Sequence, residues 1–397
     1  MNILIAGGGI GGLTAALCLA KRGHRVRVLE QATAIGEVGA GIQLSPNATR
    51  VLFDLGLESA LAAVAFRPDA TEMRHWRTGR LIAATPLGDD ALQTYGFPYF
   101  HIHRGDLIAV LEAAVHAHPL VELLTSARIE KIEEARECVQ AESTCGSFEA
   151  DVLIGADGIR SVVRATLFGP AQPQFTGNIA WRFLIPANAL PAGMIRPAAT
   201  AWWGPGGHVV HYFVRRGELV NCVFVREQSG WEVESWTEPG DPEELRAVFL
   251  GWHEHVQTLT HHARRENLFK WALFDRTPMP AWGRGRITLL GDACHPTLPF
   301  MAQGAAMAIE DAAVLAQCLA VKVAVKLEVA PALQRYEELR KTRTAGIQTG
   351  SRRNAEIFHM RGIKAWVRDR AAGKAAGNRL AAVYRYDALA VGAKSQS

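Results

Sequence analysis

Two glycine-containing turns, far apart in the chain, carry the residue types needed to hold the phosphates and sugar of a dinucleotide. The first spans residues 7–12 (GGGIGG) and the second spans residues 291–296 (GDACHP). Asp157-Gly158 lies between them in the sequence. Glycine lets the backbone approach a ligand, and a carboxylate can accept hydrogen bonds from sugar hydroxyls. The turns together indicate one cofactor that is bound at both of its ends.

The first turn has the order of elements that a dinucleotide-binding unit requires. The flanking elements are expected to be a strand, a helix and a second strand, over residues 2–6, 13–21 and 25–29. Gly7 permits the tight turn, Gly9 lets the backbone approach a pyrophosphate, and Gly12 lets the helix pack closely on the strand. Free N–H groups at the helix start favour the phosphates. Glu30 ends the second strand at the spacing expected of a ribose-binding carboxylate.

Strands are also expected before the other two turns. Residues 151–155 and 286–290 are apolar, and an Ala-rich helix is expected over residues 303–317. Three strands that each end in a Gly/Asp turn predict one parallel sheet with a shared ligand at its carboxyl edge. The expected fold class is therefore α/β, with a Rossmann-like cofactor domain.

The middle of the chain is typical of an antiparallel sheet. Residues 209–214 and 219–225 predict a hairpin with a charged turn between them. A second, substrate-binding domain is expected to be inserted into the first, and residues 333–353 are expected to be helical. The cofactor domain is expected to comprise residues 1–75, 100–177 and 278–365, and the substrate domain residues 76–99 and 178–277. A C-terminal segment, 366–397, is expected to end in loose residues 392–397.

The composition is that of a globular protein, and neither nucleic acid nor a membrane is an expected partner. Of 397 residues, 49% are hydrophobic and 21% charged, and the net charge is +4. Such a chain usually forms two domains, and it has no dense basic tract. Glycines and Lys21-Arg22 interrupt the apolar N-terminus, so neither an export signal nor a transmembrane helix is expected. Six cysteines without redox or metal spacing favour reduced thiols and a cytoplasmic protein.

The motifs and their order resemble the class A FAD-dependent aromatic hydroxylases, the group of salicylate hydroxylase, 3-hydroxybenzoate 6-hydroxylase and 6-hydroxynicotinate 3-monooxygenase. The resemblance covers nearly the whole chain. It rests on GGGIGG with Glu30, residues 39–43 (GAGIQ), residues 103–107 (HRGDL), Asp157-Gly158 and residues 291–312 (GDACHPTLPFMAQGAAMAIEDA). The fold it implies is like that of p-hydroxybenzoate hydroxylase, a Rossmann-like FAD-binding domain with an inserted antiparallel-sheet substrate domain.

By this resemblance the cofactor is FAD, and NADH, or else NADPH, is the co-substrate. Arg104 is expected to contact FAD, Asp292 to hydrogen-bond its ribityl chain, and Asp157 to serve both FAD and the nicotinamide cofactor. The helix that begins near Gln303 would aim free N–H groups at the pyrimidine edge of the flavin, which favours the reduced anion. The expected cofactor-binding residues are Gly7, Gly9, Gly12, Glu30, Gln43, Arg104, Asp157, Asp292, Gln303, Gly304 and Ala305.

The same resemblance implies that O2 is used to form a flavin hydroperoxide, which transfers OH to an electron-rich ring. A phenolate is more nucleophilic than a phenol, so a base beside the substrate helps. In related enzymes a histidine in the place of His208 is that base, and Tyr212 matches a pocket position. Pro299 would stiffen the turn beside the flavin. His208 and Tyr212 share one face of an ideal strand, and His211 lies on the other. If His208 is not the base, Tyr212 or His211 is the next candidate.

No metal site is expected. His253, His255, His261 and His262 lie in a polar helical stretch without converging acids, and His295 is expected to be structural. Trp202-Trp203 could wall an aromatic pocket or pack in the core.

The sequence leaves several alternative functions open. A monooxygenase acting on another aromatic, a quinone precursor or a xenobiotic is one, and a non-catalytic flavoprotein that binds a partner is another. The chain has no redox cysteine pair, which argues against a flavin disulfide reductase. Asp157-Gly158 and GDACHP argue against a flavin oxidase or dehydrogenase. The sequence does not specify the aromatic ring, the position hydroxylated, any loss of a carboxylate, or the arginine that would hold one. A homodimer is compatible with the sequence but not indicated by it.

Overall fold

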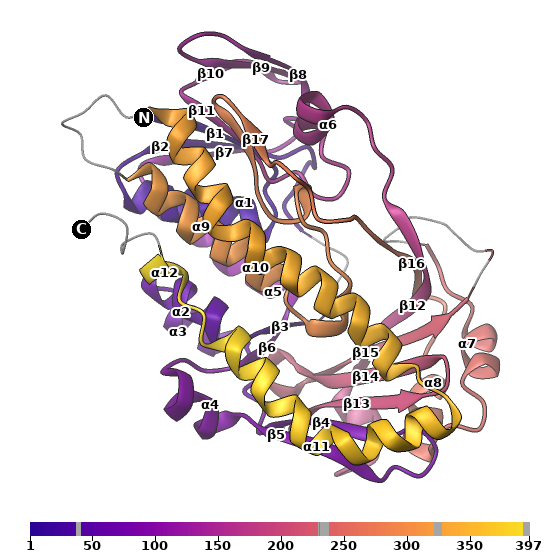
Figure 1. Cartoon of the computed structure of the whole chain (residues 1–397). Coiled ribbons are helices and arrows are strands. Elements are labelled where there is room, and N and C mark those ends of the chain that lie inside the picture. Colours follow the sequence, from indigo (N-terminus) through magenta and orange to yellow (C-terminus); the bar gives the residue numbers. More distant parts are fainter. Residues whose placement is uncertain (37–40, 229, 231–237, 321–327, 392–397) are drawn as a thin grey trace.

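The computed structural model describes residues 1–36, 41–228, 230, 238–320 and 328–391, apart from the side chains of residues 373–379. Figure 1 shows two sheets joined by long helices that run from one to the other. Residues 39 and 40 of the GAGIQ segment, and residues 392–397, lie outside this description. No helix of the described residues is both long and apolar enough to cross a membrane.

The first sheet has six strands in the order β17-β18-β11-β1-β2-β7. Its strands are β1 (Asn2–Ala6), β2 (Arg25–Leu29), β7 (Val121–Leu124), β11 (Val152–Gly155), β17 (Gly283–Arg284) and β18 (Ile287–Leu289). All neighbours are parallel except β17 and β18. Ala6 pairs with Gly155, and Gly155 pairs with Leu289, so the three turns lie side by side at one edge. The predicted parallel sheet with a shared carboxyl edge is confirmed.

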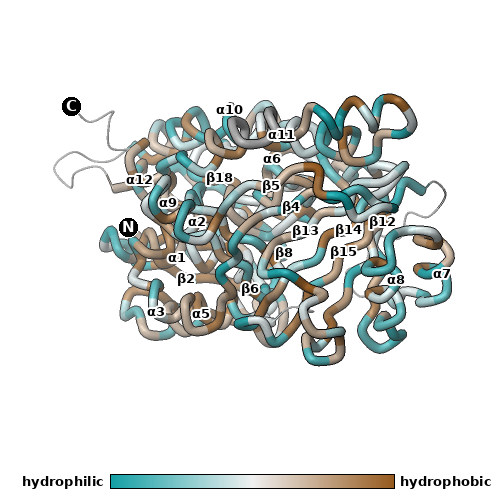
Figure 2. Tube along the Cα trace, turned by 90° about the horizontal axis from the view of Figure 1, so that it is seen from below, coloured by the Kyte–Doolittle hydropathy of each residue, from teal (hydrophilic) through white to brown (hydrophobic). Residues whose placement is uncertain are grey.

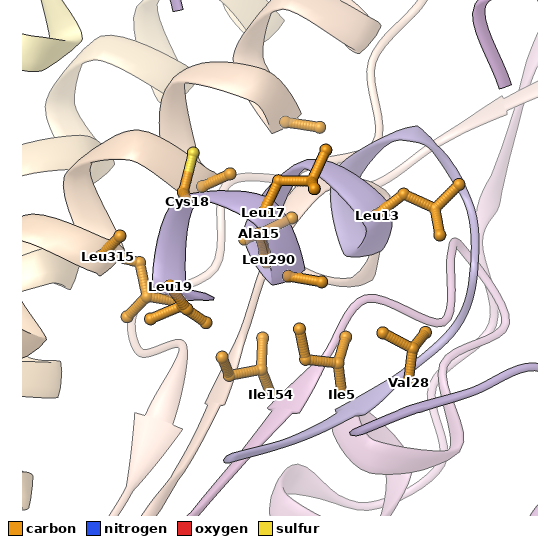
Figure 3. Close-up of a cluster of buried hydrophobic side chains, with 14 of the residues drawn as sticks. Ile5, Leu13, Ala15, Leu17, Cys18, Leu19, Val28, Ile154, Leu290 and Leu315 are labelled. Atoms are coloured by element: carbon orange, nitrogen blue, oxygen red, sulfur yellow. The ribbon is translucent and has the colours of Figure 1, made fainter. Parts of the chain in front are cut away.

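Helix α1 (Ile10–Lys21) packs between this sheet and α9 (Gly304–Leu319). Figure 3 shows Ile5, Val28 and Ile154 of the strands below Leu13 of α1, with Leu315 of α9 at the other end of the helix. The tube of α1 is predominantly apolar in Figure 2, as its burial requires. Helix α5 (Arg104–Ala117) also packs on α1. This core fixes where the glycine turns lie.

The second sheet has seven strands in the order β16-β12-β15-β14-β13-β4-β5. They are β4 (Ala70–His75), β5 (Leu81–Pro86), β12 (Gln174–Pro186), β13 (Ala198–Gly204), β14 (Gly207–Val214), β15 (Leu219–Glu227) and β16 (Phe269–Asp275). The predicted hairpin of residues 209–214 and 219–225 is formed by β14 and β15. β4 pairs with β13, so this sheet begins before the expected boundary at residue 76. β4 is short and mixes polar and apolar residues, so its sequence does not indicate that it pairs with β13.

The remaining elements connect and cover the two sheets. Two small sheets are β3 (Gly41–Leu44) with β6 (Phe100–His103), and β8 (Ile129–Glu134), β9 (Val139–Ser143) and β10 (Gly146–Ala150). The other helices are α2 (Pro46–Asp54), α3 (Glu58–Val64), α4 (Gly88–Tyr95), α6 (Val162–Phe168), α7 (Pro242–Val248), α8 (Glu254–His261), α10 (Val329–Phe358), α11 (Gly362–Tyr384) and α12 (Ala388–Val391). The predicted helix over residues 333–353 lies within α10. In Figure 1, α10 crosses from the first sheet to the second, and α11 then lies along β5.

Candidate functional site

The first glycine turn contains glycines of two kinds. A Cβ atom on Gly7 would lie 2.4 Å from the carbonyl oxygen of Ala156, and one on Gly12 would lie 1.9 Å from that of Gly7. Gly7 also has φ +103°. These two glycines are required by packing and backbone conformation. A Cβ atom on Gly9 would meet nothing within 4 Å, so its bare backbone faces open space where α1 begins. That is the geometry that a bound phosphate requires.

Glu30 fixes the neighbouring backbone. Its Oε2 atom accepts a hydrogen bond from the Gly8 N–H at 2.7 Å, and its Oε1 atom accepts one from the Ala32 N–H at 2.8 Å. The carboxylate is therefore held at the end of β2, beside the open backbone of Gly9. Its side chain is partly exposed, which leaves lone pairs for sugar hydroxyls.

The second turn, residues 291–296, places Asp292 in a recess. The side chain is open to solvent, yet the protein around it desolvates it enough to raise the pKa of its carboxyl group. The charges of His295 and Arg104 oppose that rise in the pKa. Arg104, the first residue of α5, must therefore lie close to Asp292. Two predicted cofactor contacts, far apart in sequence, thus lie together. An accessible carboxylate enclosed by protein suits a bound polyol.

Asp157 belongs to the third turn of the same edge. Its Oδ2 atom accepts hydrogen bonds from the N–H groups of Val162 and Val163, at 2.7 and 3.1 Å, at the start of α6, whose N-cap residue is Ser161. Burial raises the pKa of the carboxyl group. In this structure the side chain holds the turn itself. A contact with the cofactors remains a prediction.

Helix α9 begins at the same edge. Its first internal hydrogen bond runs from the Met307 N–H to the Gln303 carbonyl oxygen at 2.8 Å, so the N–H groups of Gly304 and Ala305 precede it. The Gln303 side chain donates to Ser45 at 2.9 Å and accepts from Asn47 at 3.0 Å, and is buried. Gln303 can therefore contact a flavin only through its backbone, because its side-chain amide connects α9 to the start of α2.

Two other predicted residues border this helix start. The Oε1 atom of Gln43, in β3, accepts a hydrogen bond from the Tyr99 hydroxyl at 2.5 Å. Pro299 begins a 3₁₀ turn, Pro299–Met301, and is exposed. Ala302, which follows, has φ +53°, an uncommon conformation for a residue with a Cβ atom. The loop is thus held in a strained shape directly before the free N–H groups of α9.

A buried ionic network fastens the second turn to the helices. His295 Nε2 lies 2.5 Å from Asp311 Oδ2, and Arg340 donates to Asp311 Oδ1 at 2.7 Å. The second carboxylate, Glu310, accepts from Arg340 and Arg343, each at 2.7 Å. These charges hold the pKa of Asp311 at about 2, against the effect of burial. The geometry is consistent with the predicted structural role of His295.

Cys294, His295 and Asp311 are the one group of described residues close enough together to bind a metal ion. Arg340 already neutralises the carboxylate, and burial with the nearby charges of Asp311 and Asp292 raises the pKa of the Cys294 thiol. A protonated thiol is a poor metal ligand. The cluster is best explained as part of the network that holds the turn.

The two faces of the seven-stranded sheet differ in burial. The outer face, under α7 and α8, carries fully buried residues such as Trp181, Trp202 and Phe224. On the inner face, Val210 and Val223 are neighbours across β14 and β15 and remain partly exposed in the middle of the sheet. An apolar surface open to solvent at the centre of a sheet is a place for an apolar ligand. A separate hollow of about 410 Å³ lies at residues 191–194 and α8, and none of the predicted residues lines it.

His208 and Tyr212 lie on the inner face, and His211 lies on the outer one. The His208 ring is 5.0 Å from that of Phe300, in the loop before α9, while Tyr212 packs 4.5 Å from His101. His211 lies 6.3 Å from Trp202 in the outer core, and burial lowers its pKa to about 3. The predicted division of β14 is confirmed, and it separates His211 from the inner face.

Both tryptophans of the Trp202-Trp203 pair are packed. Trp202 belongs to the outer core, 5.0 Å from the His253 ring. Trp203 stacks on Phe358 at 4.9 Å, with the guanidinium of Arg368 over it. Of the two interpretations, packing in the core is the one the structure supports.

Two residues near this face were missed by the sequence analysis. Arg182 of β12 donates to the Gly41 carbonyl oxygen at 3.0 Å, lies over the Trp271 ring, and its charge acts on Tyr212. His359, which directly follows α10, lies 2.8 Å from His208. Neither residue belongs to a motif. Arg182 sits in an alternating strand pattern that could have placed it on the Ala180 face, but no local signal connects His359 with β14.

Known proteins resemble this chain over most of its length. The family described as FAD binding domain matches residues 1–351. The chain is 41% identical to 3-amino-4-hydroxybenzoate 2-monooxygenase PtnB3 of Streptomyces platensis, over 99% of this chain and 98% of that protein. It is 41% identical to 6-hydroxynicotinate 3-monooxygenase of Pseudomonas fluorescens, over 89% and 91%. A salicylate hydroxylase substrate complex superposes with a TM-score of 0.83 at 27% identity, covering 99% of this chain and 97% of that one.

Proposed function

This chain belongs to the FAD binding domain family, and we propose that it is a monooxygenase that uses FAD, NAD(P)H and O2 to hydroxylate a phenolic aromatic acid. The observation that carries the proposal is the position of His208, on an apolar, partly open sheet face beside the loop that begins α9. The names of both reported relatives describe rings that bear a hydroxyl and a carboxylate.

The chain offers a fitting site for FAD. Gly9 supplies open backbone for the pyrophosphate, Glu30 the ribose carboxylate and Asp292 an acceptor for the ribityl hydroxyls. The N–H groups of Gly304 and Ala305 would lie toward the ring. When bound, FAD supplies reduction by the nicotinamide and transfer of oxygen to the substrate. The protein supplies position, electrostatics and proton transfer.

His208 is suited to accept the phenolic proton. Burial, with the neighbouring His359, holds its pKa well below the ordinary value for histidine, so the ring is neutral at pH 7 and has a lone pair available. Its Nδ1 atom is engaged by His359, and Nε2 is the nitrogen left for substrate. Tyr212, on the same face, has a phenol whose pKa is raised by burial, which makes it a hydrogen-bond donor rather than a base.

Arg182 is the residue that we assign to the substrate carboxylate. It is partly exposed, on the strand beside Val223, and close enough to Tyr212 for its charge to affect that side chain. Guanidinium groups bind carboxylates through paired, charge-assisted hydrogen bonds.

NADH is the proposed reductant, by resemblance alone. The six cysteines, none in a disulfide, support a place in the cytoplasm.

The experiment that tests the proposal screens phenolic acids for stimulation of NADH oxidation, with identification of the product. The purified protein should be yellow, and mild denaturation should release FAD that is not covalently linked. The enzyme should oxidise NADH slowly without an aromatic ligand and faster when its phenolic acid substrate is added. FMN in place of FAD, or rapid oxidation that no phenolic compound affects, would contradict the proposal.

A further inference from the structure

His208 is the first of three hydrogen-bonded titratable side chains. Its Nδ1 atom lies 2.8 Å from Nε2 of His359, and both rings are buried. The other nitrogen of His359, Nδ1, lies 3.2 Å from Oε1 of Glu227, the last residue of β15. A residue at the end of α10 thus connects two neighbouring strands of the substrate sheet.

The row leads from the buried site to solvent. His208 is 2% exposed, whereas the Glu227 side chain is 44% exposed. Arg361 donates to the other carboxylate oxygen of Glu227 at 2.7 Å, and Arg226 is the second cation whose charge reaches His359. The rings of Phe300 and Phe358 also pack against His208, with centroids 5.0 and 5.3 Å away. The carboxylate is therefore held at the surface while the two rings remain dry.

We propose that His359 and Glu227 form a proton relay that carries the phenolic proton from His208 to bulk water. This inference rests on the proposed function, and it adds two positioning residues that act through His208.

Each step moves one proton. His208 accepts the substrate proton at Nε2 and gives the proton on its Nδ1 to Nε2 of His359. His359 gives the proton on its Nδ1 to Oε1 of Glu227, which loses it to water. Only N–H and O–H bonds form and break, and no oxidant or reductant is consumed. The reverse transfer takes place while the product is still bound: Glu227 takes a proton from water and passes it back along the row, and His208 returns its Nε2 proton to the phenolate oxygen, which restores the tautomers.

The surroundings of the two rings explain why a relay is needed. Burial holds the pKa of His208 well below its ordinary value, and burial lowers that of His359 to about 4 although Glu227 opposes the shift. Neither ring can keep an added proton at neutral pH. A proton taken from the substrate must move on, and Glu227 is the exposed acceptor at the end of the row.

The test measures proton release when the oxidised, FAD-loaded enzyme binds 3-amino-4-hydroxybenzoate. Stopped-flow mixing in weak buffer with a pH-indicator dye follows the proton as it reaches solvent. In Glu227→Gln and His359→Gln the release should slow about tenfold or more, because a neutral amide cannot pass the proton on. The equilibrium affinity for the ligand should change little. 3-Amino-4-methoxybenzoate, which has no phenolic proton, should release none.

Glu243→Gln is the matched control, since Glu243 is an exposed carboxylate paired with an arginine, Arg246, in the same domain. It should release the proton at the wild-type rate. Glu227→Gln replaces an exposed side chain, so it still decides the question if His359→Gln is poorly folded. Normal binding with wild-type release rates in Glu227→Gln would overturn the relay. Failure of the wild type to bind any phenolic acid would instead overturn the proposed function.

Discussion

The two faces of the seven-stranded sheet are made by the same strands, but their histidines have different surroundings. His211, on the outer face, has no hydrogen-bond partner for either ring nitrogen among the described residues. His208, on the inner face, is bonded to His359 and through it to Glu227. Burial lowers the pKa of both. A lowered pKa therefore does not identify a base by itself, and a partner that can take the proton onward separates the two residues.

The sharpest test of this difference is His208→Ala. Loss of a general base typically costs about two to four powers of ten in the assisted step. FAD binding should stay intact, because His208 lies outside the cofactor edge, and peroxide release should rise as NADH oxidation loses its coupling to hydroxylation. Product formed per NADH consumed should be measured across pH in wild type and variant. An unchanged ratio would return His208 to a structural role and make Tyr212 the next residue to test.

Neighbouring residues of β15 give the corresponding test of stability. Phe224 is fully buried on the outer face, and Val223 is partly exposed on the inner one. Phe224→Ala should lower the free energy of unfolding by about 3–5 kcal/mol, because a large side chain leaves a cavity. Val223→Ala should cost about 1 kcal/mol or less, and change the KM for the substrate instead. Urea unfolding checks both, and equal costs would mean that the two faces are packed alike.

Arg182→Met tests the assignment of the carboxylate on the inner face. A hydrogen bond to a charged group contributes about 1.5–3 kcal/mol, so the Kd for 3-amino-4-hydroxybenzoate should rise about tenfold or more. The Kd for 2-aminophenol, the same ring without its carboxylate, should not change. Both values can be measured from the flavin absorbance on titration. An equal loss of affinity for the two compounds would show that Arg182 shapes the site, through Gly41 and Trp271, without binding the carboxylate.

The same comparison shows what the sequence could and could not predict. Local patterns were sufficient for the glycine turns, for the β14–β15 hairpin and for the separation of His208 from His211, because strand period and turn chemistry act over a few residues. The pairing of β4 with β13, and of His208 with His359, depends on contacts between segments far apart in the chain. Gln303 shows a third case, since its motif places it at the start of α9 but does not reveal that its side chain is bonded to Ser45 and Asn47.

The last expected effect concerns His211 and the stability of the fold. Its folded-state pKa is about 3, against an ordinary value of 6.5, so the folded protein keeps the ring neutral. The stability that this neutral ring allows is complete above pH 6.5 and is lost as pH falls toward 3, because the unfolded chain binds a proton that the folded one excludes. At about 1.4 kcal/mol per pH unit, the loss amounts to about 2 kcal/mol at pH 5.

His211→Leu removes the titrating group, so wild type should lose that much stability relative to the variant between pH 7.5 and pH 5. Urea unfolding at both pH values measures the difference, with His261→Leu, at an exposed site on α8, as the control. Parallel stability curves for wild type and His211→Leu would mean that the ring is protonated in the fold, and that the outer face does not exclude the charged imidazole.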